Sequence, residues 1–227
     1  MTHKSYDIFD ASLWTDDISE ARKIQEHLKK EIKLSSFKKS ISCIAGVDAA
    51  FFADKVIAVA TFYTYPGLLH IKDLYSVEKV SFPYIPGFLS FREGFAIMKA
   101  LCKSDIQPDV ILFDGHGIAH PKGIGVASHM GVILKTPSIG CAKSRLVGDY
   151  EEPDAEKGSW EPLFYKGDRV GVVLRTRTNV KPVFVSPGHL IDIDISVKII
   201  LGCTLKYRMP EPLRRADKLS KALKKSL

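Results

Sequence analysis

Three consecutive segments with the composition of β-strands limit the folds open to this chain more than any other feature. They are "SCIAGVDAAFF" (42–52), "KVIAVATFYTY" (55–65) and "LLHIKDLYSVEKV" (68–80), and all are rich in Val, Ile, Phe and Tyr. Only the short turns "ADK" and "PG" separate them. The pattern therefore predicts three antiparallel strands, joined in chain order.

A helix and a buried strand are predicted next. In 87–104, "GFLSFREGFAIMKALCKS", apolar residues recur at helical spacing, whereas "PDVILFDG" (108–115) contains a short continuous apolar run. An amphipathic helix over 15–32 is predicted ahead of the strands. The order of elements after that helix is thus β-β-β-α-β, which is typical of an α/β fold.

The remainder of the chain continues this alternation. A Gly-led helix, a strand and two further strands are expected over 123–135, 136–144, 168–177 and 181–189. Residues 149–169 are polar and predict an excursion on the surface. Closing helices are expected over 189–205 and 211–226, although "LIDIDIS" in the first alternates with the period of a strand. With 227 residues and 45% apolar content, we expect one domain, 1–227.

The charge of the chain favours a polyanionic partner. Lys and Arg number 33 against 26 Asp and Glu, a net charge of +7. Residues 206–227 carry eight basic and two acidic side chains, so +6 of charge lies in this segment. The segment is expected either to contact phosphates or to form an ordinary solvated basic helix face.

No sequence feature predicts export or membrane insertion. The N-terminal "MTHKSYDIFD" lacks the basic start and apolar block of a targeting peptide, and no uncharged apolar run approaches the ~20 residues that span a bilayer. The four cysteines lack C-x-x-C spacing, which predicts neither a zinc knuckle nor a disulfide framework. We expect a cytoplasmic protein.

Three acidic residues occupy positions where carboxylates are costly. Asp48 lies inside the first predicted strand, Glu93 in the first turns of the following helix, and Asp114 at the end of the buried strand. Each alone is more often an ordinary end-of-strand or surface acid. Together, directed at one point, they suggest a divalent cation, and ligands that are all oxygen favour Mg²⁺ or Mn²⁺ over Zn²⁺.

The topology resembles that of the ribonuclease H-like nucleases, in which a first-strand Asp, a helix Glu and a fourth-strand Asp share a site. Several words narrow the resemblance: "GVDAAF", "PYIPGFLSFREG", "LFDGHGIAHPKGIGVASHMGV", "GCAKSRLVG", "PVFVSPGH" and "YRMPEPLRRADKLS". In this order they resemble the endonuclease V family, from about residue 8 to the C-terminus.

The resemblance implies a ribonuclease H-like α/β fold with a central mixed sheet flanked by helices. It also implies a monomeric, Mg²⁺-dependent endonuclease, with Mn²⁺ as substitute, that recognises deoxyinosine in DNA. Such an enzyme hydrolyses a phosphodiester bond on the 3' side of the lesion and leaves 3'-hydroxyl and 5'-phosphate ends, in DNA repair. Two alternatives stay open: an endoribonuclease acting on inosine-containing RNA, and a non-cutting binder of deaminated nucleic acid.

Particular side chains take roles through the resemblance. Asp48, Glu93, Asp114 and His189 would bind metal, and Lys143 would join them in catalysis. Whether His116, Asp192 or Asp194 also reach the metals stays open, and His129 is expected to be structural. Two departures from the family pattern are Ala49-Ala50, in place of a hydroxyl residue, and Asp217, in place of His. Both are expected to lie outside the metal ligands.

The "PYIP" loop resembles the wedge that parts the strands at the lesion. Its prolines hold the aromatic side chain of Tyr84 and the branched side chain of Ile85 in place, with Tyr84 stacking where the modified base has turned out. A plug in the core is the alternative. The substrate-binding residues implied are Pro83, Tyr84, Ile85, Pro86, Gly87, Leu89, Gly117, His120, Val126, Gly140 and Ala142.

Overall fold

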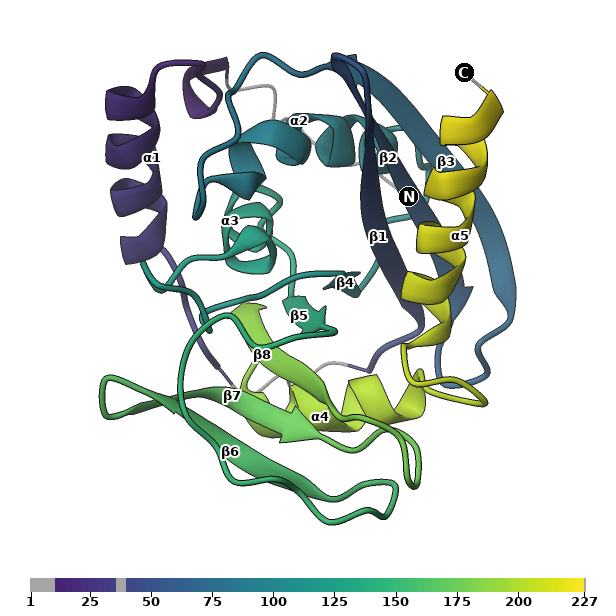
Figure 1. The fold of residues 1–227 in the computed structure, drawn as a ribbon. Coiled ribbons are helices and arrows are strands. Elements are labelled where there is room, and N and C mark those ends of the chain that lie inside the picture. Colours follow the sequence, from purple (N-terminus) through teal and green to yellow (C-terminus); the bar gives the residue numbers. More distant parts are fainter. Residues whose placement is uncertain (1–10, 36–39, 227) are drawn as a thin grey trace.

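The computed structural model describes residues 11–35 and 40–226, built around one eight-stranded mixed sheet (Figure 1). The start of the chain, where the sequence predicts no targeting peptide, lies outside the described residues. The sheet order is β3-β2-β1-β4-β5-β8-β7-β6. The strands are β1 (Cys43–Phe52), β2 (Lys55–Thr64), β3 (His70–Lys79), β4 (Val110–Phe113), β5 (Ser138–Ala142), β6 (Trp160–Tyr165), β7 (Asp168–Leu174) and β8 (Val183–His189).

Helices cover both faces of this sheet. They are the short 3₁₀-helix η1 (Ala11–Leu13) and the α-helices α1 (Ile18–Lys30), α2 (Leu89–Cys102), α3 (Val126–Ile133), α4 (Ile193–Gly202) and α5 (Glu211–Ser226). On one face α2 and α3 share an apolar core with β1, β2 and β4. On the other, α4 and α5 pack against β1, β4, β5, β7 and β8. None of the helices in the described ranges is long and apolar enough to cross a bilayer.

The predicted antiparallel strands are confirmed. β2 pairs antiparallel with β1 and with β3, whereas β4 pairs parallel with β1 on its other side and with β5 in turn. The α2 helix supplies the crossover between β3 and β4. The predicted α/β class with a mixed central sheet is therefore confirmed, and the helices expected before and after it are present.

The polar excursion predicted over 149–169 is wrong in part, because it contains β6. This strand lies at the edge of the sheet and pairs along one side with β7. Pro162 stands in its middle, and proline argues against a strand unless the strand is at an edge, where its missing N–H is not needed for pairing. The polar, proline-containing composition of this segment therefore did not indicate β6.

The alternating segment "LIDIDIS" is helical after its first residues. β8 ends at His189, and α4 begins only at Ile193. Asp192 caps this helix, because its Oδ1 accepts a hydrogen bond of 2.8 Å from the backbone N–H of Ile195. The apparent strand period thus spans a loop, a cap and the first helical turn.

One glycine determines how closely α5 can approach the sheet. A Cβ at Gly46 would lie 2.5 Å from Pro212, so any larger residue would push the start of α5 off β1. The Thr61 hydroxyl donates a hydrogen bond of 2.9 Å to the Pro212 carbonyl and fixes the same contact. Residues 46 and 48 share one face of β1. The helix anchored over Gly46 therefore continues along the face that carries Asp48.

Candidate metal-dependent nuclease site

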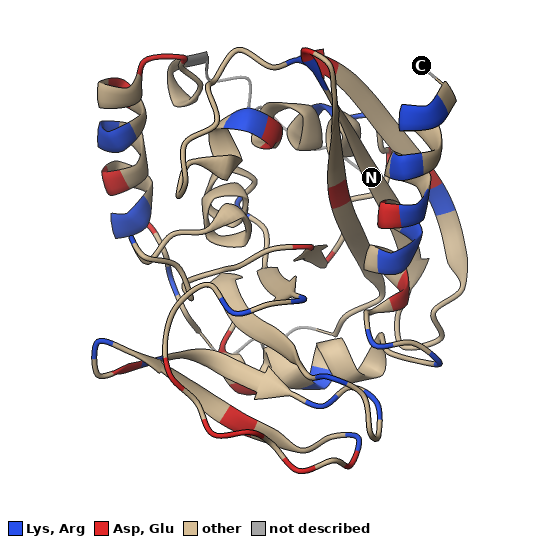
Figure 2. Cartoon of the chain, in the orientation of Figure 1, with Lys and Arg blue, Asp and Glu red and all other residues tan. Residues whose placement is uncertain are grey.

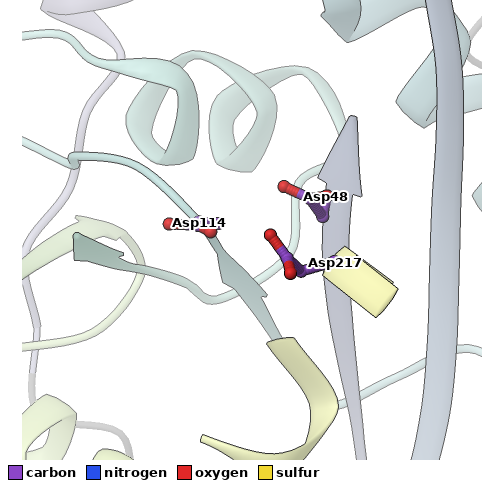
Figure 3. Close-up of side chains that lie close together, drawn as sticks. All are labelled: Asp48, Asp114 and Asp217. Atoms are coloured by element: carbon purple, nitrogen blue, oxygen red, sulfur yellow. The ribbon is translucent and has the colours of Figure 1, made fainter. Parts of the chain in front are cut away.

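Three carboxylates meet where β4 ends. Val47 on β1 stands in register with Phe113 on β4, and the strands are parallel, so the next residue on each strand brings Asp48 and Asp114 side by side. Asp217 approaches from α5, as Figure 3 shows. One oxygen atom from each of the three lies within 4.8 Å of the others. This spacing suits a cation bound by carboxylates.

A fourth carboxylate reaches the same cleft from the opposite face of the sheet. Glu93 belongs to α2 and is 7% exposed. Burial, with the negative charges of Asp48 and Asp114 adding to it, raises the pKa of Glu93 to about 8. The cleft holding these groups has a volume of about 370 Å³, and Lys143 and Lys221 also line it. Clustered acidic groups of this kind are costly without a positive charge among them.

Asp48 has a local partner on α5. The Ser220 hydroxyl donates a hydrogen bond of 2.6 Å to its Oδ2. Burial raises the pKa of Asp48 to about 6, and the nearby Asp114 charge adds to this, whereas the Ser220 hydrogen bond opposes it. Ser220 therefore helps to hold the carboxylate in its charged form and in one orientation.

Two lysines balance the acidic cluster. The Nζ of Lys143 lies 2.5 Å from Asp114 Oδ2 and 3.5 Å from Asp217 Oδ1. Lys143 directly follows β5, and Asp114 directly follows β4. Because these two strands are parallel, both residues lie at the same end of the sheet. Burial lowers the pKa of Lys143, but the hydrogen bond and charge of Asp114 raise it overall. Lys221 lies 2.8 Å from each oxygen of Asp217, one helical turn away.

The donor set fits a hard divalent cation. All four acidic groups offer oxygen, as Mg²⁺ and Mn²⁺ prefer, and no histidine or cysteine belongs to the three-residue cluster found among the described residues. The ammonium groups of Lys143 and Lys221 already stand beside Asp114 and Asp217. The site thus favours positive charge at the point where a metal would bind.

The prediction that His189 completes this metal position does not hold in the structure. β8 runs antiparallel to β5, with His189 opposite Ser138 and Phe184 opposite Ala142. His189 therefore lies at the opposite end of β5 from Lys143. Its Nδ1 accepts a hydrogen bond of 3.2 Å from the backbone N–H of Lys33. The antiparallel direction of β8, which the motif "SPGH" does not reveal, therefore separates His189 from the carboxylates.

The late-helix carboxylate is Asp217 rather than Asp192 or Asp194. Asp192 caps α4, and Asp194 lies 3.5 Å from Arg169. Asp217 was expected to lie outside the metal ligands, yet the structure places it within the three-carboxylate cluster that could hold a metal ion. Ser220 was not identified at all. The sequence could have indicated Ser220 through its helical spacing from Leu213 and Ala216, because these residues lie on the buried face of α5.

The histidines after Asp114 belong to a neighbouring pocket. His116 and His120 line it, and burial lowers the pKa of His120 to about 4, so its ring is neutral at pH 7. Burial also lowers the pKa of His116. His129 is fully buried instead, with its Nδ1 3.1 Å from the Ser90 hydroxyl and its ring edge-to-face against Phe91. A structural place for His129 agrees with this environment.

The "PYIP" loop joins a buried anchor to an exposed tip. Phe82 is 1% exposed and stacks against Phe88 and Phe91, whereas Tyr84 is 76% exposed. The Gln25 side chain donates a hydrogen bond of 2.9 Å to the Gly87 carbonyl. Phe82 therefore fills the core, whereas Tyr84 stands in solvent, and the core-plug alternative does not describe Tyr84.

One side chain of α2, Arg92, contacts the loop at two points. Arg92 Nη1 donates a hydrogen bond of 3.1 Å to the Phe82 carbonyl, and its guanidinium carbon lies 5.7 Å from the centre of the Tyr84 ring. Because α2 also carries Glu93, the exposed tip and the acidic cleft are positioned by one rigid element.

A pocket of about 240 Å³ opens between this loop and α3. It is more apolar than the acidic cleft and shares Leu89 and Val126 with it. The predicted substrate-binding residues that line it are Tyr84, Ile85, Pro86, Gly87, Leu89, His120 and Val126. The site thus consists of two adjoining hollows, one acidic and one apolar.

Four predicted substrate-binding residues do not line this pocket. Pro83 is exposed on the loop, and Ala142 packs in a core with Leu163 and Phe184. Gly117 and Gly140 pack on each other, since a Cβ at Gly140 would lie 2.5 Å from the Gly117 backbone nitrogen. These glycines allow close approach of backbone segments behind the site.

Comparison with known proteins identifies the family. The Endonuclease V family profile matches residues 26–218. Endonuclease V from Dictyoglomus turgidum is 48% identical over 204 residues, 90% of each chain. The Bacillus subtilis Endonuclease_V structure covers 100% of this chain and 98% of its own at 33% identity, with a TM-score of 0.90.

A third relative carries a bound nucleic acid. Ciona intestinalis Endonuclease V, in complex with a 24mer DNA containing an inosine followed by a ribo-adenosine, is 30% identical with a TM-score of 0.80 and covers 92% of this chain and 99% of its own. These matches span most of the chain, and the acidic cleft is consistent with them. The chain belongs to the Endonuclease V family.

Proposed function

We propose that this protein is a Mg²⁺-dependent endonuclease that recognises deoxyinosine in DNA and cuts a nearby phosphodiester bond. The observation that carries the proposal is the acidic cleft of Asp48, Glu93, Asp114 and Asp217, next to an apolar pocket beneath an exposed loop tip. The Ciona relative bound to inosine-containing DNA supports the same substrate class.

Hydrolysis of a phosphodiester requires an activated water and compensation of charge on the phosphate. Asp48, Asp114 and Asp217 would hold the metal, with Glu93 completing the acidic set. Bound Mg²⁺ would supply Lewis acidity toward the phosphate and the attacking water. The Lys143 ammonium, held beside Asp114, would bind a phosphate oxygen and offset its growing negative charge.

Recognition of the base requires it to leave the helix. Tyr84 would part stacked bases, and the turned-out base would enter the pocket behind it. Hypoxanthine differs from adenine by an O6 acceptor and a protonated N1 in place of the amino group. Main-chain groups near Gly87 and Gly115 are candidates to read that edge. A cut on the 3' side of the lesion, leaving 3'-hydroxyl and 5'-phosphate ends, completes the proposed repair reaction.

Inosine-containing RNA is the second candidate substrate. The DNA in complex with the Ciona relative contains an inosine followed by a ribo-adenosine, a nucleotide that carries a 2'-hydroxyl, and this supports RNA as a candidate. Discrimination between the two sugars depends on contacts to that hydroxyl. Parallel cleavage of matched inosine-DNA and inosine-RNA strands therefore belongs in the same assay.

The decisive experiment measures Mg²⁺-dependent cleavage by the unaltered protein and by Asp48→Ala and Asp114→Ala variants. We expect the cleavage rate of both variants to fall by at least about 100-fold. Their melting temperatures should stay close to that of the unaltered protein, which would show that they still fold. Asp168→Asn, an exposed acid at the start of β7, is the matched control and should cut normally. Undiminished cutting by a folded Asp48→Ala protein would refute the proposed site. Binding of inosine strands without any cleavage would favour the non-cutting alternative.

A further inference from the structure

An arginine outside the acidic cleft holds the backbone of Lys143. Arg208 lies in the loop between α4 and α5, within the word "YRMPEPLRRADKLS" (207–220). Its Nη2 donates a hydrogen bond of 2.6 Å to the Lys143 carbonyl and one of 2.5 Å to the Pro182 carbonyl. Arg208 lines neither the acidic cleft nor the apolar pocket. It therefore contacts the main chain of Lys143 and leaves the ammonium to the carboxylates.

The two carbonyls lie just beyond the end of a strand pair. β5 and β8 are antiparallel, and Ala142 opposite Phe184 is their last pair at this end. Lys143 follows β5, and Pro182 precedes β8. A main-chain carbonyl beyond the last pair needs a donor from outside the sheet. One Nη2 group has two hydrogens, so it joins both chains at the point where the sheet stops.

Arg208 is itself held on two sides. The Thr176 hydroxyl, just after β7, donates a hydrogen bond of 2.6 Å to the Arg208 carbonyl. The Nε of Arg208 is buried, so the guanidinium is enclosed by the fold at this edge. A planar guanidinium has its donors in a fixed geometry, unlike a lysine ammonium on a flexible stem. Arg208 therefore fixes the position of the Lys143 main chain relative to β7 and β8.

The ammonium of Lys143 is held by different groups. Its Nζ lies 2.5 Å from Asp114 and 3.5 Å from Asp217, which belongs to α5, and this helix begins three residues after Arg208. These carboxylates would also bind the metal, so their contacts with the ammonium would change when the site fills. The hydrogen bond from Arg208 goes to the main chain and does not depend on the metal.

We propose that Arg208 is a positioning residue for the cutting reaction. It fixes the main chain at Lys143, so that the ammonium meets the phosphate in the geometry that the transition state requires. The inference rests on the proposed function, in which Lys143 binds a phosphate oxygen. A displacement of about 1 Å at a reacting group can slow a reaction about 100-fold. Because Arg208 acts through Lys143, its loss slows cutting without weakening the binding of the strand.

The test measures two quantities on inosine-containing DNA. They are the single-turnover rate constant of cutting with Mg²⁺, and the Kd with Ca²⁺ in place of Mg²⁺ to prevent cutting. Arg208→Ala should lower the rate constant by about 10- to 100-fold and change the Kd by less than about twofold. In a Lys143→Ala background the same change should cost less than about threefold, because residues that act through one group are not additive.

Arg208→Lys is a second variant in case Arg208→Ala folds poorly. It keeps the positive charge but loses the planar fork, so its rate constant should fall less, by about three- to tenfold, with an unchanged Kd. Arg175→Ala is the matched control. Arg175 also donates to main-chain carbonyls, yet it lines neither the acidic cleft nor the apolar pocket. This control should lower the melting temperature and leave the rate constant unaltered.

Equal rate constants in the unaltered protein and both Arg208 variants would overturn the proposal. The same fold loss with and without the Lys143 side chain would overturn it as well, and so would an equal loss of rate in Arg175→Ala. A Kd that weakens as much as the rate falls would instead mark Arg208 as a direct phosphate contact. Absence of cutting by the unaltered protein would refute the proposed function and this role together, whereas normal cutting by both Arg208 variants would refute the role alone.

Discussion

Asp217 illustrates how the neighbours of one side chain determine its role. The residue lies on an exposed basic helix, yet one of its oxygens is within 4.8 Å of oxygens from Asp48 and Asp114. Burial raises its pKa, but hydrogen bonds and charge from Lys221 and Lys143 lower it overall, so the carboxylate is charged at pH 7. This state is the one required of a metal ligand.

Replacing Asp217 with Asn should therefore weaken both metal binding and cutting. We expect Asp217→Asn to lose at least about tenfold in metal affinity, the scale on which changes around a metal site act. The measurement is the rise in melting temperature on adding Mg²⁺, taken beside a cleavage assay. Asp194→Asn, which alters the other late-helix acid, is the control. A variant whose Mg²⁺-induced rise equals that of the unaltered protein would exclude Asp217 from the metal ligands.

Tyr84 has the opposite environment, since it is 76% exposed and its ring lies beside the Arg92 guanidinium. Its neighbour Phe82 supplies the packing of the same loop. Within one short segment, Phe82 thus supplies core packing, and Tyr84 stands in solvent, where the proposed contact with a base would be made.

Tyr84→Ala should reduce affinity for inosine duplexes by roughly 1–3 kcal/mol, the contribution of aromatic stacking on a base, and reduce single-strand binding less. Single strands lose less because no paired neighbours must be separated. Melting temperature should barely change, whereas Phe82→Ala should lower stability by about 3–5 kcal/mol as a buried Phe is lost. Equal impairment on duplex and single strand would argue against a wedge.

The α5 helix shows how one element serves the core, the site and the surface. Pro212, Leu213, Ala216 and Ser220 form its buried face against the sheet. Asp217 and Lys221 turn toward the acidic cleft. Lys224 and Lys225 extend beyond it on exposed positions, and Lys and Arg recur along the whole helix in Figure 2. The basic residues of the C-terminal segment therefore do not all have the same role.

Lys224 and Lys225 are expected to contact phosphates without regard to sequence. Changing both to Gln should weaken binding to inosine and plain strands alike and lower the slope of log K against log salt by up to about 2. Lys221 is left unaltered because it binds Asp217. The control changes Lys29 and Lys30 on α1 to Gln. Salt slopes that match the unaltered protein would leave the end of α5 as solvated surface.

The molecule as a whole buries histidines that must be neutral for it to fold. Burial lowers the pKa of His129 to about 3, against about 6.5 in an unfolded chain. Between these values the unfolded state binds more protons, so the free energy of unfolding falls as pH falls from 6.5 toward 3. Glu93 and Asp48 act in the opposite direction, because their pKa values are raised and the folded state holds their protons.

His129→Gln separates these contributions. This variant should have a flatter pH dependence of the free energy of unfolding below pH 6.5, by at most about 1.4 kcal/mol per pH unit for one site. The measurement is urea denaturation at about pH 4.5, 5.5 and 6.5, values that lie between the folded and unfolded pKa of His129. His27→Gln, on the exposed face of α1, should leave the dependence unaltered. Parallel curves for the His129 variant and the unaltered protein would show that its protonation is not linked to folding.

Local pattern alone determined most of the elements and part of the site. The order of strands and helices follows from apolar periodicity, because each element must present its apolar residues to one core. Asp48, Glu93 and Asp114 were identifiable because each ends or interrupts an apolar run, whereas Lys143 was chosen only through the resemblance to the family. β6 was missed because its signals are those of an edge strand, which has fewer apolar requirements.

Only the tertiary structure decided which distant residues share a site. The direction of β8 placed His189 at the far end of β5, and the contact of Pro212 over Gly46 brought Asp217 and Ser220 to Asp48. Helix docking depends on packing between segments more than 100 residues apart in sequence, and the direction of β8 depends on its pairing with β5. A motif records the type and spacing of its residues, whereas their convergence depends on contacts that exist only after the chain has folded.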